Sequence, residues 1–462
     1  GAAFSGCTNL TSVTLPSTLT SIEYEAFSGC TALTEIEIPA GVTSIADSTF
    51  YGCTNLTSIT LPSNLTAIDN YAFSGCTSLT EFVIPNGVEI LHGTFYGCSN
   101  LKKITIPNSV ETIEELTFSD VKPNCELIFN TSKNRISVNG SNPFPQDNYK
   151  VKFTGTTIPT QDATTSLFNA DSNLKEVTLA NTVTAIPQNA FEGCSALTKV
   201  TIENTPTEPS VLASIGGSAF YNCTSLQTIN IPGTVNAIGN QAFFQAGSGN
   251  LTMTFDGNQN MAGIVDLSTS GSDYKVVLKK GVPTKGGSSI FANDTKLKEV
   301  VYAGGYTLIA NAFTGCSRLN KVTFQSYPTI IEHVNNTDYV FPADVTGGIT
   351  IIFAPINGDM EIHDVSDLFN MSSGDFNIYP LLFKFNNSAP VGSIPPMITI
   401  RSGAFSSLTT GTFDYIFASP PDYRITYQAT DCFFAGEIGN DATDSTITYT
   451  WTISGSSGYW QQ

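Results

Sequence analysis

Apolar residues recur along the chain with a period of about 23 residues. Each copy holds a leucine and, three and five residues later, two further aliphatic residues, as in Leu33-x-x-Ile36-x-Ile38. The alternation at the last two positions predicts a short strand with one buried face, because successive side chains in a strand point to opposite sides. Pro39 follows directly and has no N–H for a ladder hydrogen bond, so we expect it to end the strand.

A phenylalanine closes each copy and shows how far the pattern extends. The regular copies contain Phe4, Phe27, Phe50, Phe73, Phe95, Phe118, Phe168, Phe191, Phe220, Phe243, Phe291 and Phe313. Phe144 and Leu267 occupy the corresponding places in the two wide gaps of this series. Less regular candidates follow at Phe341, Phe369, Phe405 and Phe434. The pattern therefore predicts about 18 turns of a repeat structure.

A longer repeat overlies the short one. Three pairs of segments match, namely NCELIF (124–129) with GNLTMTF (249–255), NYKVKF (148–153) with DYKVVL (273–278), and NLKEVTL (173–179) with KLKEVVY (296–302). Their offsets of 123 to 125 residues indicate duplication of a block of about five turns. No segment between the copies has the composition of a domain linker, so we expect one continuous array.

Self-similarity at this period around a spaced apolar core is typical of a leucine-rich repeat solenoid. The predicted fold class is an α/β leucine-rich-repeat solenoid wound as a right-handed superhelix, made mostly of short parallel strands and turns with little helix. We expect regular repeats over residues 1–325, with degenerate turns near 119–167 and 244–290. Residues 326–462 are expected to form irregular turns that continue or cap the solenoid.

The repeated phrase AF-x-G-C-T/S-x-L-T-x-I-x-I/L-P-x-x-V/L-T-x-I resembles the repeat of the BspA-like leucine-rich repeat family of bacterial surface proteins. The resemblance covers most of residues 1–245 and 288–325, and only weakly the last part of the chain. It implies a solenoid at the cell surface that adheres to extracellular matrix proteins or to other cells. Repeat families share a scaffold and vary its surface, so the resemblance is specific for the fold and not for the ligand.

Cysteine recurs at one position of the repeat. The residues are Cys7, Cys30, Cys53, Cys76, Cys98, Cys194, Cys223 and Cys316. Adjacent turns lie about 4.8 Å apart, so geometry alone permits disulfides between them. Asp171 and Asp294 take the same position in related turns, where a carboxylate can accept backbone N–H bonds. We therefore expect the cysteines to be buried, reduced thiols that pack in a ladder.

The residue before the cysteine is usually glycine and sometimes asparagine. The glycines are Gly6, Gly29, Gly52, Gly75, Gly97, Gly193 and Gly315, and the asparagines are Asn222 and Asn293. Both residue types tolerate a positive φ, so a left-handed backbone is predicted here. Ala170 is an exception that this interpretation does not explain.

The composition narrows the range of partners. The net charge is −19 and the pI about 4.4, and only 13% of residues are charged. An acidic chain lacks the clustered cations that nucleic acid or an anionic membrane requires, so neither is expected as a partner. No apolar run approaches the ~20 residues of a membrane-spanning helix. Because GAAFSGC already belongs to the repeated phrase, we expect any leader or anchor to lie outside this sequence.

Candidate catalytic and metal sites are few. The segment GDMEIHD holds Asp359, Glu361, His363 and Asp364, of which three would share one face of a strand and could grip a cation. A solvated strand edge is the favoured interpretation. No nucleophile elbow, phosphate-binding loop or catalytic cysteine signature occurs. We therefore expect no enzymatic activity, no bound metal and no cofactor.

The remaining candidate site is the outward face of the predicted strands. Stacking repeats its positions into a hydroxyl-rich surface with charges of both signs and no aromatic residue. The candidate binding residues are Glu35, Glu37, Ser58, Thr60, Glu81, Lys103, Glu176, Lys199, Glu299 and Lys321. Solenoids commonly bind partners on extended surfaces, but a solvated sheet without a ligand is an equally good interpretation of these residues.

Two functions fit this sequence. The first is a noncatalytic, secreted or cell-surface protein, expected to be a monomer, that mediates adhesion or protein–protein interaction with host or bacterial macromolecules. The second is a glycan-binding accessory protein in polysaccharide capture, for which exposed aromatic rings would be needed. The best candidates for those rings are Tyr415, Tyr423, Tyr427, Trp451 and Trp460.

Overall fold

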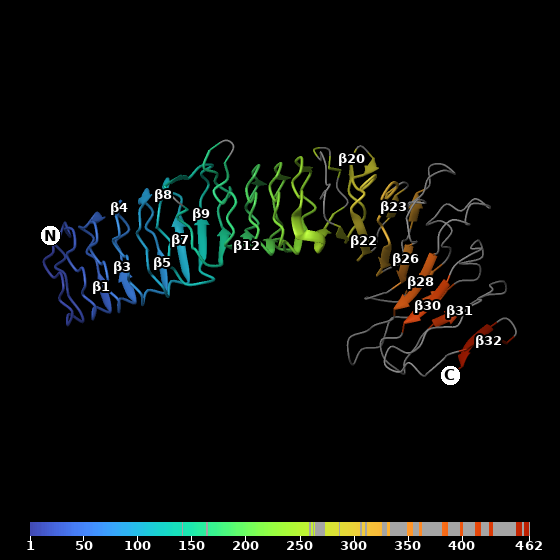
Figure 1. Ribbon diagram of the computed structural model, residues 1–462, viewed down its shortest axis with the longest axis horizontal. Coiled ribbons are helices and arrows are strands. Elements are labelled where there is room, and N and C mark those ends of the chain that lie inside the picture. Colours follow the sequence, from blue (N-terminus) through green and yellow to red (C-terminus); the bar gives the residue numbers. More distant parts are fainter. Residues whose placement is uncertain are drawn as a thin grey trace. The chain divides into compact units, whose positions relative to one another are not determined.

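The computed structural model is a stack of short parallel strands joined by turns (Figure 1). It describes residues 1–325 except 141, 163–164, 258–259, 262, 264–272, 286, 305–306 and 310–311, and beyond them the backbone of the strands β25 to β33. By its contacts the chain divides into two compact units, Gly1–Ile229 with Ile238–Gly247 and Asn230–Ala237 with Ser248–Gln462.

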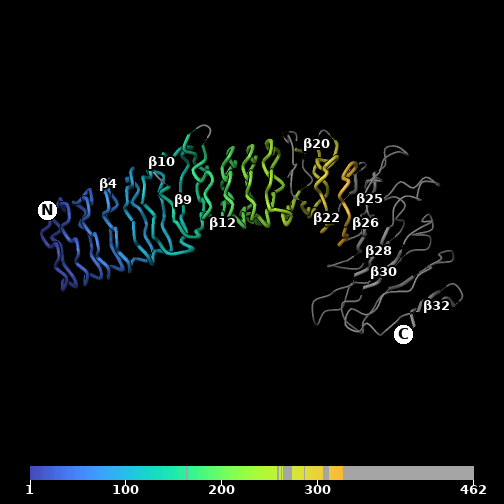
Figure 2. Tube along the Cα trace, viewed as in Figure 1, coloured from blue at the N-terminus to red at the C-terminus, as the bar shows by residue number. Residues whose placement is uncertain are grey.

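The main strands of the first unit are parallel and follow the order of the sequence. They are β1 (Glu35–Glu37), β3 (Ser58–Thr60), β5 (Glu81–Val83), β7 (Lys103–Pro107), β9 (Glu126–Asn130), β11 (Tyr149–Phe153), β12 (Leu174–Leu179), β14 (Lys199–Ile202) and β16 (Thr228–Ile231). β1 pairs with β3, and each strand from β5 onward pairs with the next in this series. The tube in Figure 2 shows these turns, from blue to green, as copies of one path.

A second column of strands follows the prolines. Its members are β2 (Ser44–Ile45), β4 (Ala67–Ile68), β6 (Ile90–Leu91), β8 (Thr112–Glu114), β10 (Ser137–Asn139), β13 (Ala185–Ile186), β15 (Ser214–Ile215) and β17 (Ala237–Ile238). Ile45, Ile68 and Leu91 point inward from this column. The core of these turns is therefore closed from a second side by the apolar residues after the proline.

The second unit repeats the main column. Its strands β18 (Leu251–Phe255), β19 (Tyr274–Leu278), β22 (Leu297–Tyr302), β24 (Lys321–Phe324), β26 (Ile349–Phe353), β28 (Leu381–Asn386) and β30 (Thr412–Ile416) are parallel. The remaining strands of the second unit, outside its main column, are β20 (Thr284–Lys285), β21 (Ser288–Ser289), β23 (Thr307–Ile309), β25 (Ile330–Glu332), β27 (Met360–Ile362), β29 (Ile398–Ile400), β31 (Ile425–Tyr427), β32 (Thr450–Ser454) and β33 (Ser457–Gln461). β20 pairs with β21, and β32 with β33, in antiparallel hairpins.

Helix is almost absent from the described part of the chain. The 3-10 helix η1 (Ala246–Gly249) is the one helical element there. No helix in this part has the length and apolar character needed to cross a bilayer. The predicted solenoid of short parallel strands and turns is confirmed. About 12 turns contain both a described strand and a described phenylalanine, fewer than the 18 predicted, and Leu267, Phe341, Phe369, Phe405 and Phe434 lie outside the described residues.

The phenylalanines form a stacked column through the first unit. The ring centroids of Phe27 and Phe50 are 5.6 Å apart at an interplanar angle of 2°, and those of Phe50 and Phe73 are 5.4 Å apart at 9°. All three side chains are buried. Each ring removes a large apolar area from water and contacts its copies on both sides. This column explains why the spacing of phenylalanine defines the repeat.

The cysteine ladder is buried as predicted. The Sγ atom of Cys53 donates to the carbonyl oxygen of Phe27 at 3.1 Å, and Cys76 donates in the same way to Phe50 at 3.2 Å. Burial raises the pKa of the Cys53 thiol to about 12, because the charged thiolate is disfavoured away from water. Cys7, in the first turn, is exposed. Each buried thiol of the ladder thus ties its own turn to the phenylalanine of the preceding turn.

The predicted left-handed backbone is also present. Gly29 has a φ of 71°, Asn222 one of 57° and Asn293 one of 65°. A Cβ atom built on Gly6 or Gly52 would meet no atom within 4 Å, so glycine is favoured there by its backbone freedom and not by lack of space. Ala170 adopts the same conformation at a φ of 54°. Its turn therefore carries a strained alanine where other turns have glycine.

Candidate functional site

The ten predicted surface residues lie on the outward face of the main strands. In the first unit Glu35 is paired in register with Ser58 and Glu37 with Thr60, while Ile36 between them is buried. Two further register pairs in this unit are Glu81 with Lys103 and Glu176 with Lys199. Glu299 and Lys321 are register partners in the second unit. We call the outward side of β1 to β14 the sheet face of the first unit.

Two residues missing from the prediction complete a charge ladder on this face. Glu126 in β9 is in register with both Lys103 and Lys150, and Lys150 in β11 is in register with Glu176. The ladder runs through Glu81, Lys103, Glu126, Lys150, Glu176 and Lys199. Glutamate and lysine therefore alternate over six successive strands. Both residues can be found in the sequence, in the segments NCELIF and NYKVKF. They were missed because these segments lie in turns where the 23-residue spacing is irregular.

One ion pair lies within this ladder, and a second lies beside it. Lys150 Nζ lies 3.0 Å from Glu176 Oε1, and Lys152 Nζ lies 2.8 Å from Glu203 Oε1. Opposite charges placed directly across a parallel or antiparallel pair stabilise it modestly, by up to ~1 kcal/mol when exposed. The middle of the face therefore carries charges of both signs, and some of them are already paired.

The second unit holds the same arrangement around one carboxylate. Glu299 Oε1 is 3.0 Å from the Nζ atoms of both Lys275 and Lys321. Partial burial acts to raise the pKa of Glu299, but hydrogen bonds and charge from the two lysines together outweigh it and hold the pKa below its ordinary value. Lys275 and Lys150 are equivalent residues of the duplicated block, so the pairing was duplicated with it.

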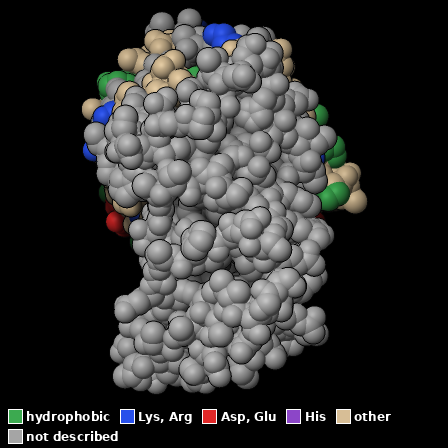
Figure 3. Space-filling model, turned by 90° about the vertical axis from the view of Figure 1, so that its right-hand side faces the viewer, with side chains coloured by type: hydrophobic (Ala, Val, Ile, Leu, Met, Phe, Trp, Pro, Cys, Tyr) green, Lys and Arg blue, Asp and Glu red, His purple; other side chains and the backbone are tan. Residues whose placement is uncertain are grey.

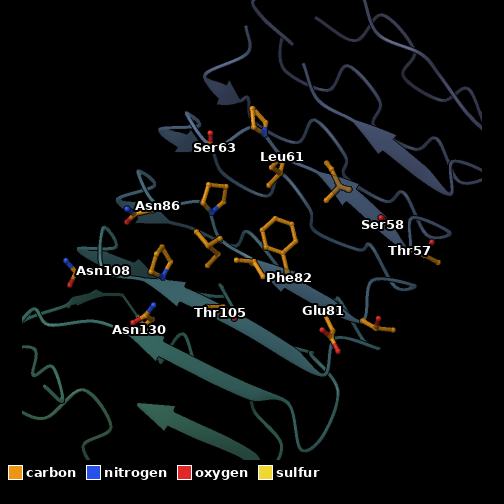
Figure 4. A pocket seen from close by; sticks show the side chains of 17 residues that line it. Thr57, Ser58, Leu61, Ser63, Glu81, Phe82, Asn86, Thr105, Asn108 and Asn130 are labelled. Atoms are coloured by element: carbon orange, nitrogen blue, oxygen red, sulfur yellow. The ribbon is translucent and has the colours of Figure 1, made fainter. Parts of the chain in front are cut away.

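Two grooves hollow the sheet face of the first unit at its N-terminal end. The larger, with a volume of about 990 Å³, crosses β3, β5, β7 and β9 and is lined by residues that include Glu81, Val83 and Asn86. Figure 4 shows Ser63, Asn86, Asn108 and Asn130 at the strand ends on one side, with Glu81 away from them on the other. The smaller, of about 590 Å³, lies over β1 and β3. Glu35 and Glu37 line it.

The grooves combine an apolar floor with carboxylates. Val83 is 69% exposed although it is a branched aliphatic residue in the middle of a sheet face. Ile59 and Leu61 of the preceding turn are half-buried and line the same groove. Neither groove has a lysine or arginine among its lining residues. The larger groove thus places an exposed apolar residue beside Glu81, a carboxylate that forms no ion pair within the described residues.

Other predicted candidates fall outside this face. Within the described residues no group of three histidine, cysteine or acidic side chains could hold a metal ion. The side chains of GDMEIHD lie outside the described residues, as do those of Tyr415, Tyr423, Tyr427, Trp451 and Trp460. In Figure 3 the coloured side chains of the described residues show no dominant kind in that view. The grooves therefore remain the best-defined candidate site.

Aromatic side chains are exposed elsewhere on the first unit. Tyr24, Tyr51 and Tyr96 are 58%, 51% and 39% exposed. Tyr51 follows Phe50 and Tyr96 follows Phe95, so the two tyrosines share one repeat position two turns apart. The sequence pattern marks this position, but only the structure shows that the two rings reach solvent.

Known proteins similar to the chain are leucine-rich repeat proteins. One solved structure is a leucine rich repeat protein of T. pallidum, 24% identical over 46% of this chain and 76% of that chain, with a TM-score of 0.22. Another is from Bacteroides ovatus, 24% identical over 76% and 86%, with a TM-score of 0.25. A leucine rich cell surface protein from Faecalibacterium prausnitzii is 20% identical over 70% and 86%, with a TM-score of 0.23. No match was found among curated proteins.

The family model for the BspA type leucine rich repeat region matches this chain in 6 copies. The matched residues are 1–126, 162–262 and 276–336, which together make up more than half of the chain. They include the turns with the buried phenylalanine column and the cysteine ladder. The chain therefore belongs to the BspA type leucine rich repeat family.

Proposed function

We propose that this chain is a noncatalytic, secreted or cell-surface protein that binds a macromolecular partner on the sheet face of its first unit. The observation that carries the proposal is the pair of grooves over β1 to β9, with Val83 exposed in the larger one. Apolar groups that become buried in the centre of an interface dominate binding energy, and surrounding polar groups exclude water. Val83 offers an exposed apolar contact on which the larger anchoring side chain of a partner can pack.

The position of the grooves on the face supports this proposal. Where Lys150 pairs with Glu176, a partner would have to replace ion pairs that already exist. At Glu35, Glu37 and Glu81 no such pair must be broken, because no lysine or arginine among the described residues forms an ion pair with them. A partner is therefore favoured at the N-terminal end of the face. Membership of the BspA type family supports a surface location and an adhesive role. We further propose that the protein acts as a monomer.

Binding of the whole chain to immobilised matrix proteins, and to cells of the host or of other bacteria, tests this function. We expect saturable binding to one class of partner and its loss in Val83→Arg, which places a long charged side chain in the larger groove. Val211→Arg is the matched control, because Val211 is 51% exposed and does not line either groove. Equal binding by both variants, or no saturable binding at all, would contradict the proposal.

Glycan binding is the second candidate function, supported by the exposure of Tyr51 and Tyr96 at one repeat position. Exposed aromatic rings offer an apolar surface with a polar hydroxyl, a combination suited to a sugar ring. A glycan array probed with the whole chain tests it. Signals that disappear in Tyr51→Ala/Tyr96→Ala and persist in Val83→Arg would select this function over the first.

A further inference from the structure

We propose that the grooves of the sheet face bind an extended polypeptide segment in which basic residues flank an apolar side chain. The proposal rests on the function proposed above and names the chemistry of its partner. Three features of the two grooves specify that chemistry: their charge, their apolar floor and their length.

The charge of the grooves selects a cation. Glu35 and Glu37 line the smaller groove and Glu81 lines the larger, and all three are exposed. Elsewhere on main strands, Glu176 and Glu299 each have a lysine at 3.0 Å. Glu35 and Glu37 are in register with Ser58 and Thr60, and Glu81 forms no ion pair with its register partner Lys103 among the described residues. The three carboxylates therefore present negative potential to an incoming ligand. Anionic ligands, nucleic acid among them, would be repelled.

The carboxylates do not form a metal site. Glu35 and Glu37 are separated by the inward-facing Ile36, and Glu81 stands on a strand two turns further along. No metal-binding group of three acidic, cysteine or histidine side chains exists among the described residues. A ligand that reaches all three carboxylates must therefore carry its positive charges at separate points along an extended chain.

The apolar floor selects a hydrophobic residue between those charges. Val83 stands two residues beyond Glu81 on β5, and both point outward from the strand. A ligand side chain that covers Val83 also meets Leu61 and Pro62 of the preceding turn, which line the same groove. Burial of such apolar contacts supplies affinity, and a lysine or arginine beside the buried residue meets Glu81 at the edge.

The length of the groove suits an extended chain. The larger groove crosses four turns, and a strand-like ligand rises about 3.3 Å per residue against about 4.8 Å for each turn crossed. About four ligand residues thus span it. Asn86, Asn108 and Asn130 line one side of the groove, and carboxamides can both donate to and accept from a peptide backbone. Asn108 Oδ1 already accepts the N–H of Ser132 at 2.8 Å, which holds that amide in place.

An array of decapeptides tests the proposal with the whole chain as probe. The peptides place lysine or arginine beside leucine or valine, lysine without an apolar residue, glutamate beside leucine, or neutral residues only. We expect the first set to bind best, and the affinity for it to fall about tenfold in Glu35→Gln/Glu37→Gln/Glu81→Gln. Binding should also weaken as salt is raised, because exposed charges are screened.

The control variant is Glu23→Gln/Glu89→Gln/Glu208→Gln, which removes the same charge from exposed glutamates outside both grooves. It should bind like the unmodified protein. If neutral or acidic peptides bind as well as basic ones, or if both triple variants bind alike, the proposed ligand chemistry is wrong. If Val83→Arg still abolishes binding of the macromolecular partner, the function proposed above stands. If no groove variant changes binding, both the proposed function and the proposed ligand chemistry are overturned.

Discussion

Two regions of the first unit share one scaffold but differ in how they use charge. The turns from Phe27 to Ile106 carry cysteine in the ladder and unpaired glutamates on the sheet face. The turns from Phe144 to Ile202 include Asp171 at the ladder position, and Lys150 pairs with Glu176 on the face. The phenylalanine column runs through both regions. The column fixes the fold, so surface charge is left free to vary.

The interior of the second region shows how a carboxylate replaces a thiol. Asp171 Oδ1 accepts the N–H groups of Asn173 at 2.8 Å and Leu174 at 3.2 Å, and its Oδ2 accepts the hydroxyl of the buried Tyr149 at 2.6 Å. Asp294 makes the same contacts with Lys296, Leu297 and Tyr274 in the duplicated block. The tyrosine and the aspartate therefore recur together in the duplicated block, where each pair shares a buried hydrogen bond.

The largest expected effect is in thiol reactivity, between the first turn of the cysteine ladder and the buried thiols of the first region. With a pKa of about 12 against an ordinary value of about 9.0, the Cys53 and Cys98 thiols have roughly a thousandfold smaller thiolate fraction near neutral pH. We expect alkylation of the native protein, followed by peptide mass spectrometry, to modify the exposed Cys7 and to spare them. Rapid labelling of Cys53 in the folded protein would show that the ladder is open to solvent.

Asp171→Ala should destabilise its own turn strongly. It leaves the Tyr149 hydroxyl and two N–H groups without their acceptor, at an expected cost of about 3 kcal/mol. Because each turn of a solenoid contacts only its neighbours, amide hydrogen exchange in β12 is the appropriate measurement. Asp147→Ala is the control, since Asp147 is exposed. Equal protection of β12 in both variants would mean that Asp171 is replaceable by water.

The ion pair on the face should contribute least. Lys150→Gln removes the partner of Glu176 and should lower the free energy of unfolding of this region by about 0.5 kcal/mol, an effect that disappears in high salt. Lys199→Gln on the same ladder is the matched control, because Lys199 is exposed and makes no ion pair within the described residues. A salt-independent loss in Lys150→Gln would point to packing of its aliphatic stem instead of charge.

The regular turns could be predicted residue by residue. The inward position of Ile36, the positive φ at Gly29 and the burial of Cys53 all follow from one phrase repeated at a fixed spacing. The candidate site was predicted less completely. Glu126 and Lys150 were missed because their turns lack the spacing that aligns the others, although their strands pair in register with Lys103 and Glu176.

The sequence by itself determined the scaffold, because burial of a recurring apolar set at one period has essentially one solution, a stack of turns. Only the tertiary structure decided which side chains meet. Strand register carries Lys150 beside Glu176 across a turn with an irregular offset at Tyr149 and Lys150. It also places Lys103 across from Glu81, yet these two form no ion pair among the described residues. Contacts between neighbouring turns depend on how their strands are aligned in three dimensions. The irregular spacing of the degenerate turns in the sequence does not reveal that alignment.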